Sequence, residues 1–269
     1  MTAISALISK NWLAVASDSL LTEFYPDKNL ITHSEFRRSK IVPIRKFKAA
    51  AAYWGLAKIG NWRTYDFLRE QAANSNNFES FEGFAINLKD RLNEKLNEFT
   101  FSNPVHKGIG IHLVGFEVVN RANIPELFLI SNYLDTTYTA IGDLAISRNL
   151  YGTLPSDLRQ ENHTLQEQRA IIIRFLDNNG LFIFNNGDPA LFNPAANAIH
   201  GMFRIAIERG AIKNDNKTIM KLASKPIDMI KEMQRDFFKK EFIRVGGKIH
   251  HLLITERGDF ISNTGDNKF

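Results

Sequence analysis

The sequence predicts an α+β sandwich, in which two antiparallel sheets lie stacked between layers of helices. The first observation is the order of the expected elements: strands, two helices, strands, helices and a final strand. Such segregated runs favour an α+β arrangement over the alternating winding of a parallel sheet. The second observation is the composition. A chain of 269 residues, 44% apolar and 23% charged, can bury a sizeable core in one large domain or two small ones.

The first expected element is an N-terminal hairpin. Small and branched residues precede Lys10-Asn11, which suits a two-residue turn, and the segment "WLAVASDS" continues as a second strand. Such a turn pairs Ser9 with Trp12, and the same register pairs Thr2 with Ser19. We therefore expect the start of the chain to lie beside the end of the second strand.

The rest of the chain divides into further strands and helices. A loop containing Thr22 follows the hairpin, and residues 135–162 are so rich in turn residues that they receive no assignment. The remaining segments are assigned from apolar periodicity, caps and turn residues. They are strands at 40–44 and 46–54, helices at 56–73 and 79–99, strands at 108–119 and 125–133, a helix at 165–179 with a Thr164/Glu167 capping box, a strand at 181–187, helices at 193–210 and 217–239, and a closing strand and turn at 245–260.

Composition excludes several classes of protein. The net charge of +5 is modest for this length, and the densest basic run, 37–48, alternates with apolar side chains as in a strand with one solvated face. The sequence has no cysteine, its histidines are scattered, and it lacks a secretory signal or a membrane-spanning apolar run. We expect a cytoplasmic protein that needs no metal or other cofactor and binds neither nucleic acid nor a membrane.

Candidate chemistry centres on Thr2. A small second residue permits removal of Met1, which would leave a hydroxyl and a free amine on one residue, and such an amine is a base of suitable strength. Asp18 and Lys40 are available to tune that amine. Gly55, which we expect between a strand and a helix, allows the close backbone approach that an oxyanion hole needs.

Three segments carry a resemblance to a known group of enzymes. The stretches "MT…LAVASDS", "SKIVPI" and "AAAAYWGLAK" resemble the opening of the N-terminal-nucleophile (Ntn) peptidases. These include 20S proteasome β subunits, their bacterial relative that serves an ATP-driven unfoldase, and the bacterial Anbu family, to which "ASDS" and "FRRSK" are most similar. The resemblance covers roughly residues 2–75 and 181–260. It implies one four-layer αββα Ntn-hydrolase domain, with an inserted segment at about 135–180.

The resemblance also implies roles for individual residues. Thr2 is the nucleophile, Asp18 and Lys40 support it, and Gly55 contributes the oxyanion-hole amide. Ser19 and Asn186 are supporting residues, and Asn186 stands where the family has a serine. The aspartate and serine that hold the terminal amine in the family correspond best to Phe242 and Val245, with Glu241 as a substitute if the register slips by one. By family position, the pocket for the residue before the cut is lined by Leu21, Arg38, Val42, Tyr53 and Ala57.

The function expected from these residues is hydrolysis of peptide bonds in peptides or unfolded proteins. Two alternatives stay open, namely an amidase for small molecules with the same machinery and an inert assembly subunit. We also expect self-association into a ring or stack, because Ile171, Ile172, Ile173 and Phe175 cannot all face one side of a helix. The sequence does not identify an ATPase partner.

Overall fold

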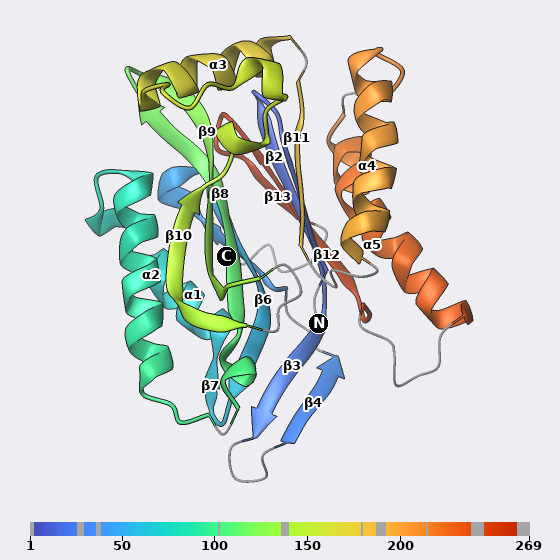
Figure 1. Cartoon of the computed structure of the whole chain (residues 1–269). Coiled ribbons are helices and arrows are strands. Elements are labelled where there is room, and N and C mark those ends of the chain that lie inside the picture. The colour runs from blue at the N-terminus through green and yellow to red at the C-terminus, as the bar shows by residue number, and fades with distance from the viewer. Residues whose placement is uncertain are drawn as a thin grey trace.

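Two β-sheets lie face to face with helices on both outer sides in the computed structural model (Figure 1). The structure describes residues 3–25, 30–35, 39–101, 103–135, 140–178, 180–186, 192–213, 215–237 and 245–262. The predicted α+β sandwich of stacked sheets between helical layers is confirmed.

The first sheet has five strands, all paired antiparallel, and β1 lies between β11 and β2. Ile4 pairs with Ser17 and Ile8 with Leu13, which is the register predicted from the turn at Lys10-Asn11. The strand order across the sheet is β11 (Phe182–Asn186), β1 (Ile4–Ile8), β2 (Trp12–Asp18), β12 (Ile249–Thr255) and β13 (Phe260–Ser262).

The second sheet has eight strands and is antiparallel except at one place. β3 runs parallel to β6, with Thr22 opposite Leu56. The main order is β10 (Ile141–Arg148), β9 (Ala122–Tyr133), β8 (Ile109–Val119), β6 (Ala49–Ile59), β3 (Leu20–Tyr25) and β4 (Leu30–Glu35), while β5 (Ile41–Ile44) and β7 (Trp62–Arg63) pair with β6.

Helices cover both outer faces and one end of the sandwich (Figure 1). α1 (Thr64–Ala73) and α2 (Phe81–Asn97) lie on the eight-stranded sheet, and α4 (Phe192–Glu208) and α5 (Asn216–Phe237) lie on the five-stranded sheet. α3 (Leu165–Asp177) crosses the end of both sheets. Three apolar clusters result, one between the sheets and one beneath each helical layer.

The structure corrects three sequence-based assignments. The helix expected at 56–73 begins only at Thr64, because β6 continues to Ile59 and turns at Gly60, whose φ is +54°. Gly55 therefore lies inside a strand rather than between a strand and a helix. The expected loop around Thr22 is the β3–β4 hairpin, and the unassigned middle contains β10.

α3 begins with the capping box that the sequence predicts, since Thr164 and Glu167 each bond the other's backbone amide. Ile172 is buried in the cluster between the sheets, so the outward position expected for it is wrong. Ile171 and Phe175 are half-buried and pack against the same cluster, because α3 covers the end of the sandwich, and Ile173 is half-buried as well. Self-association stays a prediction.

Candidate functional site

A buried ion pair lies where β2 ends. The side chains of Asp18 and Lys40 are both fully buried, and Lys40 Nζ lies 3.0 Å from Asp18 Oδ1. Lys40 also donates a hydrogen bond to the carbonyl oxygen of Leu20. Lys40 immediately precedes β5, so the pair joins the two sheets.

The surroundings of Lys40 make its ammonium group easier to deprotonate than a lysine in water. Burial lowers the pKa of Lys40 below its usual value, and the charge of Asp18 opposes that shift. An unpaired ammonium at this depth would be costly, so the carboxylate and the ammonium depend on each other. Such an ammonium can raise the acidity of a neighbouring amine or hydroxyl through its electrostatic field.

Backbone amides from both ends of the chain complete the bonding of Asp18. The Ala3 amide donates to Oδ1 at 3.0 Å, and the Gly246 amide donates to Oδ2 at 3.1 Å. In the residue after Asp18, the Ser19 hydroxyl accepts a hydrogen bond of 2.8 Å from the Lys248 amide. Asp18 thus holds the start of β1 and the segment that leads into β12 together.

Thr2 itself lies outside the described residues, as do Arg38, Glu241 and Phe242. Its covalent neighbour Ala3 is described and donates its amide to Asp18. The structure therefore brings Asp18, Ser19 and Lys40 together at the residue that follows Thr2. The role of Thr2 as nucleophile stays a prediction.

The third candidate, Gly55, lies on the strand next to Lys40. Ile41 pairs with Ala52, so β6 runs past Lys40 and reaches Gly55 three residues later. Gly55 has a φ of +81°, a conformation that favours glycine. The role of Gly55 as the oxyanion-hole residue stays a prediction.

The structure describes the side chains of three of the five predicted pocket residues. Val42, Tyr53 and Ala57 are buried in the cluster beneath α1 and α2, while the side chain of Leu21 is among those that are not described. Burial raises the pKa of the Tyr53 phenol far above its usual value, so this group stays neutral. Their role as pocket residues stays a prediction.

Asn186 lies at the end of β11, opposite Ile4 of β1. Its side-chain nitrogen lies 3.5 Å from Nε2 of His112, which comes from β8 of the other sheet. Burial lowers the pKa of His112 to about 4, so the imidazole is neutral at physiological pH. Val245, at the position where the family has a serine, is buried and donates its amide to Gln234 at 2.9 Å.

Several groups at the site escaped the sequence analysis. The Leu20 carbonyl and the Gly246 amide are backbone groups, so the identity of the residue does not reveal their role. The only sequence feature noted in this segment was the double glycine at 246–247. His112 appeared only as one of the scattered histidines. No group of three or more histidine, aspartate or glutamate side chains that could hold a metal ion occurs among the described residues. In the same part of the chain, no helix is long and apolar enough to cross a membrane.

These layers are those of an Ntn-type sandwich fold, with a buried carboxylate at the end of β2 and its ammonium partner just before β5. Among solved structures the chain is similar to Anbu (ancestral beta-subunit) from Yersinia bercovieri, with a TM-score of 0.51 and 12% sequence identity over 100% of this chain and 89% of that one. At this identity the similarity establishes the proteasome-like fold and nothing finer.

A second similar structure is Thiobacillus denitrificans BPH, at 10% identity over 94% of this chain and 97% of that one, but its TM-score of 0.44 is too low to support a conclusion. No family model matches the sequence, and no curated protein matches it.

Proposed function

We propose that this protein is a proteasome-like threonine peptidase that hydrolyses peptide bonds with Thr2 after removal of Met1. The observation that supports the proposal best is the fully buried Asp18–Lys40 pair, which is bonded to the amide of the residue after Thr2. Burying a charge pair is costly, and a pair bonded to the residue next to Thr2 supports a role in activating that threonine.

The proposed reaction has two stages. Thr2 Oγ attacks the peptide carbonyl carbon while the α-amine of the same residue accepts the hydroxyl proton, and the leaving amine then takes that proton as the carbon–nitrogen bond breaks. Water hydrolyses the resulting ester and frees Thr2. Lys40 supports both stages, because its positive charge lowers the proton affinity of the amine and stabilises the threonine oxygen as it loses its proton.

Incubation with a peptide epoxyketone, followed by intact-mass measurement, tests the proposal. We expect one adduct per chain lacking Met1, and none on the Thr2→Ala variant. A matched control is Thr153→Ala, whose hydroxyl bonds the Leu150 carbonyl at 2.9 Å in a remote turn and which should react like the wild type. Failure of the wild type to react would leave the inert-subunit alternative. Turnover of small amides with no cleavage of peptides would favour the amidase.

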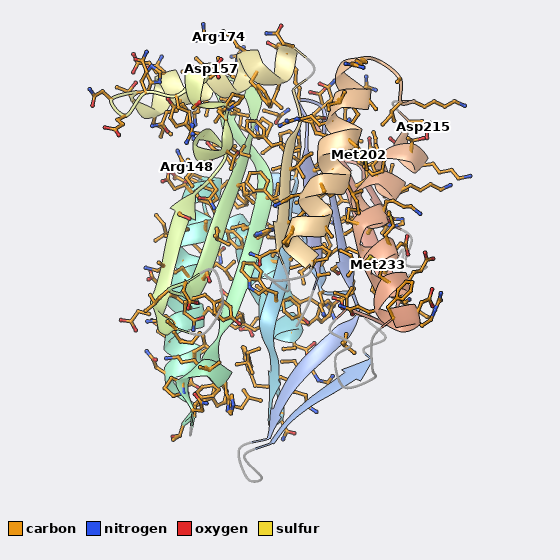
Figure 2. The ribbon with its side chains drawn as sticks, turned by 45° about the vertical axis from the view of Figure 1, so that its right-hand side comes forward. Arg148, Asp157, Arg174, Met202, Asp215 and Met233 are labelled. Carbon is orange, nitrogen blue, oxygen red and sulfur yellow. The ribbon has the colours of Figure 1, made fainter. Side chains whose placement is uncertain are left out.

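We also propose self-association, through the outer side of α5. Met229, Met233 and Phe237 recur every four residues there and are exposed by 37%, 41% and 82%. Figure 2 labels Met233 on this helix. An exposed apolar row of this kind is characteristic of an interaction surface. Light scattering should therefore give a mass above 30.7 kDa that rises with concentration.

A paired comparison tests whether that row is the contact. Met233→Lys should lower the mass, whereas Val118→Lys, at a residue near the end of β8 that is more exposed than Met233, should leave it unchanged. A monomer at every concentration would contradict self-association.

A further inference from the structure

Both backbone groups of Gly246 bind the end of β2. The Gly246 amide donates to Asp18 Oδ2 at 3.1 Å, and the Gly246 carbonyl oxygen accepts a hydrogen bond of 3.2 Å from the Ser19 amide. Two residues later, the Lys248 amide donates to the Ser19 hydroxyl at 2.8 Å. The position of Gly246 therefore determines whether Asp18 keeps the hydrogen bond to its second carboxylate oxygen.

Two side chains of α5 hold the residues on either side of Gly246. Gln234 is fully buried, and its Oε1 accepts a hydrogen bond of 2.9 Å from the Val245 amide. Lys231 is half-buried, and its ammonium group donates to the carbonyl oxygen of Gly247. Residues three positions apart lie on the same face of a helix. One face of α5 thus bonds to the chain just before and just after Gly246.

The segment needs this support because of its sequence. Gly246 and Gly247 lack side chains that could anchor them, and glycine loses more conformational freedom on folding than any other residue. Gly247 also has a φ of +72°, a conformation that favours glycine. Without bonds on both sides, such a pair would sample many backbone conformations, and in few of them would the Gly246 amide point at Asp18.

The Gly246 amide in turn controls the orientation of the Asp18 carboxylate. With Oδ2 held by this amide, the carboxylate can rotate little, so Oδ1 stays directed at Lys40 Nζ and at the Ala3 amide, each 3.0 Å away. Misplacing a supporting group by about 1 Å can slow a reaction by roughly 100-fold. A continuous series of hydrogen bonds therefore connects α5 to the ion pair beside Thr2.

We propose that Gln234 and Lys231 are positioning residues for the reaction of Thr2, because they hold Gly246 where its amide orients Asp18. The inference rests on the proposed function of Thr2. Both side chains act through the Asp18 carboxylate and not on the substrate, so they affect the rate of the chemical step and not the binding of a peptide.

Gln234→Met removes the acceptor and keeps a side chain of similar length. We expect the rate at which Thr2 forms an epoxyketone adduct at saturating reagent to fall about tenfold, with the half-saturating concentration unchanged. The matched control is His200→Leu in the same helical layer. His200 Nε2 lies 3.2 Å from the Leu222 carbonyl oxygen, which Pro226 leaves without its usual helical partner. This control should lower the thermal midpoint as Gln234→Met does, but react at the wild-type rate.

Lys231→Met tests the second bond. The residue is half-buried, so this variant should fold, and it is the decisive one if Gln234→Met does not. We expect a smaller fall in the same rate, because Gln234 still holds the segment. Lys225→Met removes the same charge from an exposed position on α5, and it should react like the wild type.

A double-mutant cycle with Asp18→Asn shows whether Gln234 acts through Asp18. If it does, Gln234→Met should cause no further loss of rate in the Asp18→Asn protein, because the carboxylate that it orients is already absent. A further loss of about tenfold in that background would mean that the two residues act independently, and would overturn the inference.

The remaining outcomes separate this inference from the function on which it rests. A wild-type protein that reacts, with Gln234→Met and Lys231→Met at the same rate, overturns the positioning role alone. Equal slowing by Gln234→Met and His200→Leu would show a general loosening of the helical layer, and would also overturn that role. A wild-type protein that forms no adduct overturns both proposals.

Discussion

Two buried ionic groups among the described residues have different surroundings. One is the Asp18–Lys40 pair. The other is Glu126 on β9, whose side chain is 1% exposed and lies 2.9 Å from Arg169 Nε and 3.4 Å from Arg148 Nε. Both groups place a carboxylate beside cations in the interior, so burial and pairing alone do not distinguish them.

The remaining partners of each carboxylate distinguish the two groups. Asp18 accepts bonds from the Ala3 and Gly246 amides, at the start of β1 and the approach to β12. Among the described residues, Glu126 pairs with the side chains of Arg148 and Arg169, and Arg148 extends the cluster to Glu82 of α2 at 2.8 Å. The Glu126 cluster thus fastens α2, α3 and β10 to β9, whereas Asp18 organises the backbone beside Thr2, the proposed nucleophile. A buried charge marks a candidate site only when the groups it orients can react.

The largest expected effect is on activity. Asp18→Asn keeps the size of the side chain but removes the charge opposite Lys40, so it should slow adduct formation at Thr2 by roughly 10³-fold. The measurement is the rate of epoxyketone adduct formation by intact mass. A variant that reacts within tenfold of the wild type would make the Asp18–Lys40 pair structural, like the Glu126 cluster.

The converse change should affect stability and not activity. Glu126→Gln leaves Arg169 without its carboxylate partner and Arg148 with Glu82 alone, so we expect the free energy of unfolding to fall by about 3 kcal/mol. Urea denaturation measures this loss, and the exposed Glu161→Gln serves as the control. Loss of adduct formation in a folded Glu126→Gln protein would contradict the contrast between the two groups.

Two buried histidines differ from both ionic groups, because burial keeps their side chains neutral and they need no counter-charge. Burial lowers the pKa of both His112 and His200 from 6.5 to about 4, and His200 Nε2 lies 3.2 Å from the Leu222 carbonyl oxygen. The unfolded chain binds protons at these residues below pH 6.5, while the folded protein does not bind them until about pH 4. Stability should therefore fall as the pH drops through this window, by about 2 kcal/mol per histidine at pH 4.5.

Comparing urea denaturation at pH 7.5 and 4.5 isolates this effect. His200→Gln can still donate to Leu222 but does not titrate, so its loss between the two pH values should be about 2 kcal/mol smaller than that of the wild type. Equal losses in the two proteins would show that His200 does not titrate differently in the folded state.

The smallest expected effect concerns the helix that carries Arg169. Thr164→Ala removes the N-cap of α3 together with the hydroxyl that donates to Glu167 at 2.7 Å, so it should cost about 1 kcal/mol of stability and leave adduct formation unchanged. Ser80→Ala is the matched control on α2, because the Ser80 hydroxyl accepts from the Gly83 amide at 3.0 Å and its loss should cost a similar amount. A change in reactivity for Thr164→Ala alone would connect α3 to the candidate site.

Turn residues, capping residues and apolar periodicity predicted the features of the fold that depend on residues close together in the sequence. The two-residue turn at Lys10-Asn11 fixed the β1–β2 register, because side-chain alternation then allows no slip. The capping box and the apolar stripe of α2 were likewise readable, since each depends on residues within one or two turns of helix. Placing Asp18 at the start of β1 followed from the same register.

Other features of the fold could not be predicted from local sequence signals. The β3–β4 hairpin has no glycine in its turn region, and β10 alternates weakly, so neither stood out from its surroundings. Ile172 of α3 was misjudged because the sequence does not show that this helix lies across the end of two sheets. Gln234 could not be connected to Asp18, since they lie far apart in the sequence and only the fold brings them to the same segment.

The placement of β1 has a consequence for the order of events during synthesis. β1 lies between β2, which follows at once, and β11, which is made about 180 residues later, and Asp18 receives the Gly246 amide later still. At translation rates of roughly 5–20 residues per second, the surroundings of Asp18 are completed more than ten seconds after Thr2 leaves the ribosome. A growing chain thus carries its first residues before Asp18 has all of its partners. Under the proposed function, the ribosome and neighbouring nascent proteins do not meet a complete active site, because the site is complete only after Gly246 has been made.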